Sequence, residues 1–213
     1  MFLTAEKLAP LVARYGQPRV VEITEAVSPA EMDMVLASRK DGRAHDVTCF
    51  ILDGRGRVAV IRKHFHPPGV WRAPSGGIRP GEDVEAGIRR EMREETGLHV
   101  QLLRYLLRIH ALFVEEGGGR EQNWVSHVFA CRPVYCAQPA GLELRPEDNH
   151  EIASARWATV GELQGPIREA LLATGRGLFR YRVALTDLAV AELRRAGLVP
   201  GTVGGTVSGG TAG

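Results

Sequence analysis

Three glutamates near the middle of the chain, Glu91, Glu94 and Glu95, have the spacing that brings carboxylates together on a helix. Residues three and four apart are neighbours on a helix surface, so the three carboxylates should fall within about one quadrant. Like charges at this spacing repel one another, and carboxylates beside a core lose hydration. The cluster is therefore expected to hold a cation, and oxygen ligands favour Mg²⁺ or Mn²⁺ over zinc. The carboxylates border an apolar stripe on the same helix, formed by Val84, Ile88 and Met92.

A solvated, glutamate-rich helix face is the alternative interpretation of this cluster. Arg89 and Arg93 fall on the far side of the predicted helix and cannot neutralise the carboxylates. Only Arg90 is adjacent, four residues before Glu94, where it can hold that carboxylate in one rotamer. Three carboxylates at a core boundary favour the metal-binding interpretation.

The spacing over residues 76–98 decides between these interpretations. Gly76 is followed after five residues by Glu82, and after seven more by the run from Arg90 to Leu98. Nine matching positions arise by chance at well below about one in a million per start position. This stretch resembles the signature box of the Nudix hydrolase family, a loop–helix–loop that binds divalent cations. The resemblance implies an α/β/α sandwich around a mixed β-sheet, and hydrolysis of a pyrophosphate linkage.

The resemblance also implies a role for each residue of the box. Glu91 and Glu95 correspond to the principal metal ligands, and Gly76 would add its backbone carbonyl. Glu94 would be a further ligand or orient a water molecule, while Arg90 would position the glutamates. The remaining defined residue, Glu82, would lock the loop–helix–loop.

Residues outside the box are candidates for the other catalytic roles. Glu151 precedes a predicted strand that contains Trp157. In many members of the family, a glutamate at this place binds metal or acts as the general base. Rival bases lie in a polar, glycine-rich loop that could close over a substrate. These rivals are Glu115, Glu116 and Glu121.

Substrate-binding candidates lie upstream of the box and in two later strands. Arg62, at a strand end, could meet phosphates, as could Lys63 beside it, and Trp71 begins the approach to the box. Ser75 stands where many relatives have a small apolar residue or glycine. Phe65, Phe113 and Trp124 are candidates for stacking on a base, although each is more typical of a core residue.

The remaining elements must form the scaffold for these residues. Helices are predicted at 4–14 and from Pro29 to Ser38, and strands at 19–27, 98–114 and 123–132. Asp53-Gly54 predicts a hairpin between strands 46–52 and 57–62. The box helix should span 83–96 and end at Gly97. A strand at 152–157 and helices at 160–173 and 187–196 complete the prediction.

These elements divide the chain into four parts. Residues 1–40 are predicted as a helix–strand–helix extension that could serve as a dimerisation arm, giving a homodimer. Residues 41–175 would form the hydrolase domain and 176–199 a helical extension. The Gly-rich residues 200–213 would be a disordered tail.

Composition places the protein in a broad class. The 213 residues include 27 Lys and Arg against 25 Asp and Glu, which gives no whole-molecule reason to expect duplex nucleic acid or a membrane as partner. No signal peptide or membrane-spanning stretch is recognised. Three cysteines without a CxxC pair, Cys49, Cys131 and Cys136, favour reduced thiols in a soluble, cytoplasmic protein.

We therefore expect a metal-dependent hydrolase acting on a small nucleotide, with ADP-ribose or a nucleotide sugar favoured. One alternative is an inactive sensor or interaction module with the same fold, although an intact box argues against it. A second is an isoprenoid diphosphate isomerase, which would require a catalytic cysteine outside the strand-like surroundings of Cys49 and Cys131.

Overall fold

A computed structural model describes residues 3–39, 42–134 and 142–201. Cys136 and nearly all of the predicted 200–213 tail lie outside these residues. Within the described ranges, no helix is both long and apolar enough to cross a membrane.

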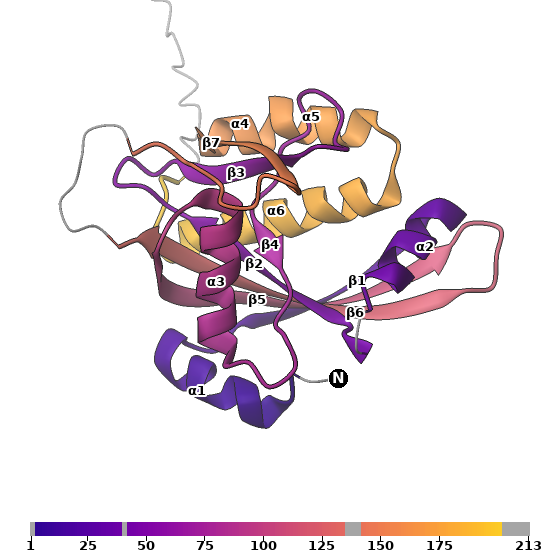
Figure 1. The fold of residues 1–213 in the computed structure, drawn as a ribbon, viewed down its shortest axis with the longest axis horizontal. Helices are drawn as coiled ribbons and strands as arrows, with labels where there is room; N and C mark the ends of the chain where they lie inside the picture. Colours follow the sequence, from indigo (N-terminus) through magenta and orange to yellow (C-terminus); the bar gives the residue numbers. More distant parts are fainter. Residues whose placement is uncertain (1–2, 40–41, 135–141, 202–213) are drawn as a thin grey trace, which may run out of the picture.

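The main sheet has five strands in the order β1-β5-β6-β2-β4 (Figure 1). The central strand β6 pairs antiparallel with β5 and parallel with β2, and β1 runs parallel to β5. The sheet is therefore mixed, as predicted. Its strands are β1 (Arg19–Val27), β2 (His45–Ile51), β4 (Ser75–Gly76), β5 (Val100–Glu115) and β6 (Glu121–Pro133).

A second sheet contains two antiparallel strands, β3 (Val58–Lys63) and β7 (Ile152–Ala158). The predicted hairpin between β2 and β3 is wrong, because β2 pairs with β4 and β6 instead. The turn itself forms: Asp53 accepts hydrogen bonds from the backbone of Arg55 and Arg57. One antiparallel β-bridge joins Leu52 to Val58, and beyond it β2 and β3 belong to different sheets.

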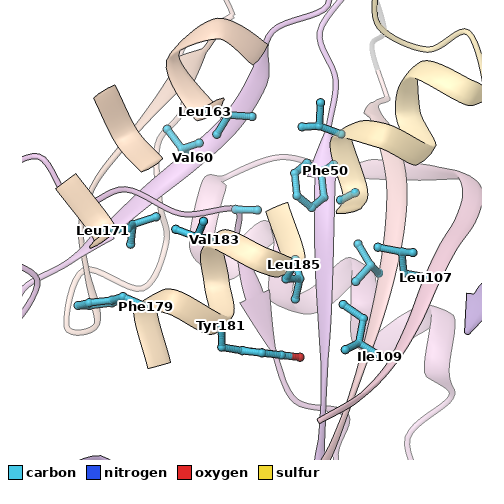
Figure 2. Close-up of a cluster of buried hydrophobic side chains, with 14 of the residues drawn as sticks. Phe50, Val60, Leu107, Ile109, Leu163, Leu171, Phe179, Tyr181, Val183 and Leu185 are labelled. Carbon is cyan, nitrogen blue, oxygen red and sulfur yellow. The ribbon is translucent and has the colours of Figure 1, made fainter. Parts of the chain in front are cut away.

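Helices cover both faces of the main sheet, giving the α/β/α sandwich (Figure 1). One core cluster joins the sheet to α1 (Ala5–Tyr15) and α3 (Val84–Thr96). The other joins it to α2 (Pro29–Ala37), α4 (Val160–Gln164), α5 (Pro166–Ala173) and α6 (Gly177–Arg195). Figure 2 shows this second cluster, in which Phe179, Tyr181, Val183 and Leu185 of α6 pack with sheet residues such as Phe50 and Leu107.

Two of the predicted helices differ from the structure by more than one residue. The single helix predicted at 160–173 is two helices, because Gly165 has non-helical torsion angles and Pro166 begins a new helix. The last helix begins at Gly177 rather than at 187. Its first half alternates apolar and charged residues from Phe179 to Val183, a pattern that also suits a strand.

Residues 3–39 are integrated with the main sheet in this chain. β1 pairs with β5 along its whole length, and α1 buries Leu8 and Leu11 in the core beneath α3. α6 packs on β1, β5 and α5. The predicted helix–strand–helix order is observed, and the dimerisation role stays a prediction.

Candidate active site

The loop–helix–loop is fixed at both ends of α3. The Asp83 side chain accepts a hydrogen bond from the Ala86 backbone N–H, which caps the first turn. Gly97 ends the helix with φ 74°, a left-handed conformation that favours glycine. The bounds predicted for this helix are confirmed to within one residue.

Glu91 and Glu95 both lie against the short strand β4. The Ser75 backbone N–H donates to Glu95 Oε2 at 2.6 Å, and the Gly77 N–H donates to Glu91 Oε1 at 3.2 Å. A Cβ atom placed on Gly76 would lie 1.9 Å from a Glu91 carboxylate oxygen. Only glycine therefore allows this approach, which brings the Glu91 carboxylate to the backbone of Gly76.

Arg90 links the helix carboxylates to the preceding loop. It donates two hydrogen bonds to Glu82, at 2.8 and 2.9 Å, and one to the Gly77 carbonyl at 3.0 Å. Its Nη1 donates to Glu91 at 2.8 Å and to Glu94 at 3.0 Å. Hydrogen bonds with Glu82 raise the pKa of Arg90, against the effect of burial. Glu82 and Arg90 thus have the contacts expected of residues that hold the loop on the helix.

Glu95 is the most buried of the three helix glutamates, with 4% of its surface exposed. Burial raises its pKa, although Arg72 and Lys63 oppose this shift. Arg72 Nη2 lies 3.7 Å from Glu95 Oε1, and Lys63 Nζ lies 4.0 Å from it. Burial, with Arg72 nearby, lowers the pKa of Lys63 to about 7. A buried carboxylate thus faces a buried guanidinium, Arg72, and a half-buried ammonium, Lys63.

Arg72 is positioned by main-chain and side-chain contacts. Its backbone forms a two-way bridge with Ile61 of β3, at 2.8 and 3.0 Å. Its Nη1 donates to the Ser75 hydroxyl at 2.7 Å. Ser75, the departure from the common pattern of the family, therefore supplies an acceptor to this buried guanidinium.

Lys63 contacts both Glu151 and the box residue Glu95. Pairing of β3 with β7 sets Lys63 opposite Ile152, and the Lys63 ammonium forms an ion pair with Glu151. The Glu151 side chain is 48% exposed, so water can reach it. Two of the three rival glutamates are paired elsewhere, Glu115 with Arg120 and Glu116 with Arg180. The third, Glu121, is the exposed first residue of β6.

The donor set suits a divalent cation. In the parts of the chain that the structure describes, no three His, Cys, Asp or Glu side chains already converge on a metal position. The cations beside Glu91 and Glu95 in this structure are the side chains of Arg90, Lys63 and Arg72. Two carboxylates and the adjacent Gly76 backbone nevertheless offer only oxygen donors, which hard ions such as Mg²⁺ and Mn²⁺ prefer.

A cavity of about 220 Å³ opens beside this cluster. Lys63 and Arg72 line it, together with residues of α2, β5, β6 and α6. Arg62 and Trp71, the predicted substrate residues, are not among its lining residues; the Trp71 ring packs on the core under Arg156. Successive strand residues point to opposite faces, so Lys63, which was also a candidate, lines the cavity in place of Arg62, and Arg72 lines it in place of Trp71. The three predicted stacking residues, Phe65, Phe113 and Trp124, do line it.

The two described cysteines lie in buried surroundings, in which a thiol is unreactive. Cys49 and Cys131 are free and fully buried on β2 and β6, which pair with each other. Burial raises the pKa of Cys49 well above its usual range. Neither thiol has the exposed, ionised environment of a catalytic cysteine.

Comparisons with known proteins identify the family of this chain. Residues 42–177 match the family model described as the NUDIX domain. An RNA pyrophosphohydrolase from Caulobacter vibrioides is 38% identical over 153 residues, covering 61% of this chain and 77% of the relative. Nudix hydrolase 5 from Arabidopsis thaliana is 28% identical over 119 residues, or 54% of this chain, and the match spans only 36% of that relative's length.

Two solved structures are similar to this chain at low sequence identity. A UDP-X diphosphatase has a TM-score of 0.46 at 16% identity, covering 78% of this chain and 72% of that one. A MutT protein from Methanosarcina mazei has a TM-score of 0.48 at 16% identity, covering 72% of this chain and 95% of that one. The family match over residues 42–177, together with the complete box on α3, shows that this chain belongs to the Nudix family.

Proposed function

We propose that the protein is a metal-dependent pyrophosphohydrolase that cleaves a nucleoside diphosphate linked to a second moiety, with ADP-ribose or a nucleotide sugar favoured. The observation that carries this proposal is the pair of carboxylates, Glu91 and Glu95, held on the backbone of Ser75–Gly77 beside a cavity that Lys63 and Arg72 line. Glu91, Glu95 and the Gly76 carbonyl would hold Mg²⁺ or Mn²⁺, with Glu94 as a further ligand or water-orienting group. Bound there, the metal supplies charge neutralisation and an acidified water.

The protein's own residues orient the reaction. Arg90 fixes Glu91 and Glu94, while Lys63 and Arg72 offer positive charge to the substrate phosphates. The water oxygen bonds to one phosphorus, the bridging P–O bond breaks, and a proton of the water passes to Glu151. Both products carry phosphate.

The role of Glu151 has a direct test. Glu151→Gln should lower kcat by roughly 10²- to 10⁴-fold, the usual contribution of a general base. Glu147→Gln is the matched control, because Glu147 is similarly exposed and pairs with Arg93 on the outside of α3. If Glu151→Gln kept wild-type activity, Glu151 would not be the general base, and Glu94 or a loop glutamate would be assigned that role.

A second candidate substrate is the 5′-triphosphate end of RNA. The relative named an RNA pyrophosphohydrolase, at 38% identity over 153 residues, favours it. The near balance of 27 basic and 25 acidic residues argues against a long nucleic-acid surface, and only a local phosphate site is required. An inactive sensor stays a further alternative.

A substrate panel separates these candidates. The purified protein would be incubated with Mg²⁺ or Mn²⁺ and each compound, and products identified by mass spectrometry. ADP-ribose, nucleotide sugars, NADH, diadenosine polyphosphates, coenzyme A, nucleoside triphosphates and a 5′-triphosphorylated oligonucleotide form the panel. We expect the highest kcat/KM with ADP-ribose or a nucleotide sugar. Preference for the oligonucleotide would select the second candidate instead.

A further inference from the structure

Residues 142–150 lie against the C-terminal end of α3. Three of their backbone N–H groups donate to carbonyls of that helix: Arg145 to Thr96 at 3.0 Å, Glu147 to Glu94 at 3.0 Å and Asp148 to Glu94 at 2.9 Å. The last carbonyls of a helix have no partner within the helix itself. A Cβ atom on Gly97 would lie 2.1 Å from the Arg145 carbonyl oxygen, so the segment passes directly over the residue that ends α3. The end of the box helix and this segment are therefore fixed to each other.

Asp148 joins the box helix to Glu151 through two contacts. Its backbone N–H donates to the Glu94 carbonyl at 2.9 Å. Its side-chain Oδ1 accepts hydrogen bonds from the backbone N–H groups of His150 at 3.0 Å and Glu151 at 3.1 Å. An aspartate that accepts from the N–H groups shortly after it closes a tight local turn. One residue thus sets the backbone of Glu151 relative to the helix that carries the box carboxylates.

The backbone of Glu151 is also held at the end of β3. The His64 N–H donates to the Glu151 carbonyl at 3.3 Å. The pairing of β3 with β7 skips Ala153: Lys63 lies opposite Ile152, and Arg62 opposite Ser154. A bulge of this kind redirects neighbouring side chains and is common beside active sites. Glu151 therefore enters the site from a backbone that is held on both sides.

We propose that Asp148 is a positioning residue, which holds Glu151 at a fixed place relative to the carboxylates of α3. The inference rests on the proposed function, in which Glu151 takes a proton from the attacking water. A general base works only within hydrogen-bond reach of that proton, so a small shift of its backbone lowers the rate. The Glu151 side chain is 48% exposed, and packing around it alone does not supply this precision. Lys63 orients the Glu151 carboxylate, and Asp148 fixes its backbone.

Two substitutions at Asp148 separate this contact from a general effect on the fold. With the best compound of the panel and Mg²⁺, Asp148→Ala should lower kcat by roughly 10- to 100-fold, the effect of a misplaced catalytic group. KM should change little, since Glu151 acts on the water and not on the bound substrate. Asp148→Asn keeps a side-chain oxygen that can accept the same two hydrogen bonds, so it should retain most of the wild-type kcat. Equal losses of kcat in the two variants would overturn the inference.

Asp53 provides a matched control in the turn at the other end of β3. Its Oδ1 accepts hydrogen bonds from the backbone N–H groups of Arg55 at 2.9 Å and Arg57 at 2.8 Å, the same kind of contact that Asp148 makes. Asp53→Ala should lower thermal stability at least as much as Asp148→Ala, because Asp53 also forms an ion pair with Arg57. It should leave kcat at the wild-type level. A kcat that falls equally in both alanine variants would show a general effect of weakened turns and contradict the positioning role.

A double variant shows whether Asp148 acts through Glu151. Residues that act as a unit give losses that do not add. Asp148→Ala combined with Glu151→Gln should therefore be no slower than Glu151→Gln alone. A further loss as large as that of Asp148→Ala alone would show that Asp148 acts independently of Glu151, and would overturn the inference.

Amide hydrogen exchange, followed by NMR spectroscopy, tests the contact without turnover. The His150 and Glu151 N–H groups should exchange roughly threefold faster or more in Asp148→Ala than in the wild type, because each loses its acceptor. Asp148→Asn should keep the wild-type exchange rates at both positions.

The outcomes separate this inference from the proposed function. Wild-type kcat in Asp148→Ala, in an enzyme that Glu151→Gln inactivates, would overturn the positioning role and leave the hydrolase standing. A protein that hydrolyses nothing on the panel would reject the hydrolase, and amide exchange would then decide the contact alone. Faster exchange at Glu151 in Asp148→Ala would support the holding of Glu151 by Asp148, and unchanged exchange would overturn it.

Discussion

At the scale of single residues, Arg90 is the group on which the order of the box depends. Its guanidinium binds Glu82, the Gly77 carbonyl, Glu91 and Glu94 at the same time. The side chain is 15% exposed, so these hydrogen bonds are largely shielded from water. A planar fork of donors can satisfy several oxygens in fixed directions, and an ammonium group cannot.

Replacement of Arg90 by lysine should therefore disorder the box although it keeps the charge. We expect Arg90→Lys to lower the free energy of unfolding by about 1.5–3 kcal/mol, the usual contribution of a hydrogen bond to a charged group. Urea denaturation measures this change, and metal-dependent activity should fall with it. Arg89→Lys is the control, since Arg89 is 52% exposed and pairs with Glu85 within its own helix. A surface pair of this kind should change stability by less than about 1 kcal/mol. Equal effects of the two variants would contradict the special role of Arg90.

The box residues could be identified from sequence because helix periodicity alone places them together. Glu91, Glu94 and Glu95 depend only on the geometry of one helix. The cavity residues could not be found in this way: Arg182 meets Asp46 from 136 positions away in the chain. Cationic chemistry indicated both Arg62 and Lys63, and the family resemblance indicated Trp71, but strand alternation places only Lys63 and Arg72 in the cavity.

At the scale of elements, the sequence pattern predicted most helices and strands but not all of their partners. The strand Arg19–Val27 has its predicted bounds, since its β-branched residues favour an extended chain. The pairing of β2 with β6 rather than β3 depends on tertiary contacts that a local turn signal cannot report. The sequence did not predict the early start of α6, because Phe179, Tyr181 and Val183 alternate with arginines, as in a strand. Packing against the sheet overrides this strand-like alternation.

The junction of α2 and α6 predicts a pH-dependent stability. Burial raises the pKa of Glu31, but hydrogen bonds from the Leu178, Ser28 and Gly177 backbones outweigh it and lower the pKa below its ordinary 4.5. A carboxyl whose pKa is lowered by folding stabilises the fold above its unfolded pKa, and this contribution is lost as pH falls through its folded pKa. Glu31→Gln should therefore be less stable than the wild type at pH 7, and the difference should shrink below pH 4.5.

Urea denaturation from pH 3 to 7 measures this difference. Exposed Glu169 of α5 provides the control, because Glu169→Gln should change stability by no more than about 0.5 kcal/mol across the range. A Glu31→Gln difference that stays constant from pH 7 to pH 3 would show that the carboxylate charge does not hold α6 on α2.

At the scale of the whole molecule, the sheet, the box and the flanking segments form one connected body. β1 extends the main sheet through β5, α1 packs beneath α3, and α6 fills the space between the main sheet and the layer of β3, β7, α4 and α5 (Figure 1). The family match covers residues 42–177, and residues of the α2 segment and of α6 outside this match also line the cavity. Substrate choice in this protein is thus expected to depend on parts of the chain that the box does not contain.

The most direct test of the central claim is the metal dependence of pyrophosphate cleavage by wild type and Glu95→Gln. With the best compound of the panel, product formation would be followed by mass spectrometry during titration with Mg²⁺ and then with chelator. We predict two phosphate-containing products, complete loss with chelator, and a kcat reduced more than about 100-fold in Glu95→Gln, since disturbing even an outer partner of a metal ligand costs 10–100-fold. Cleavage that persists with chelator or in Glu95→Gln would contradict the account, and tight binding of a panel compound without any turnover would identify a sensor.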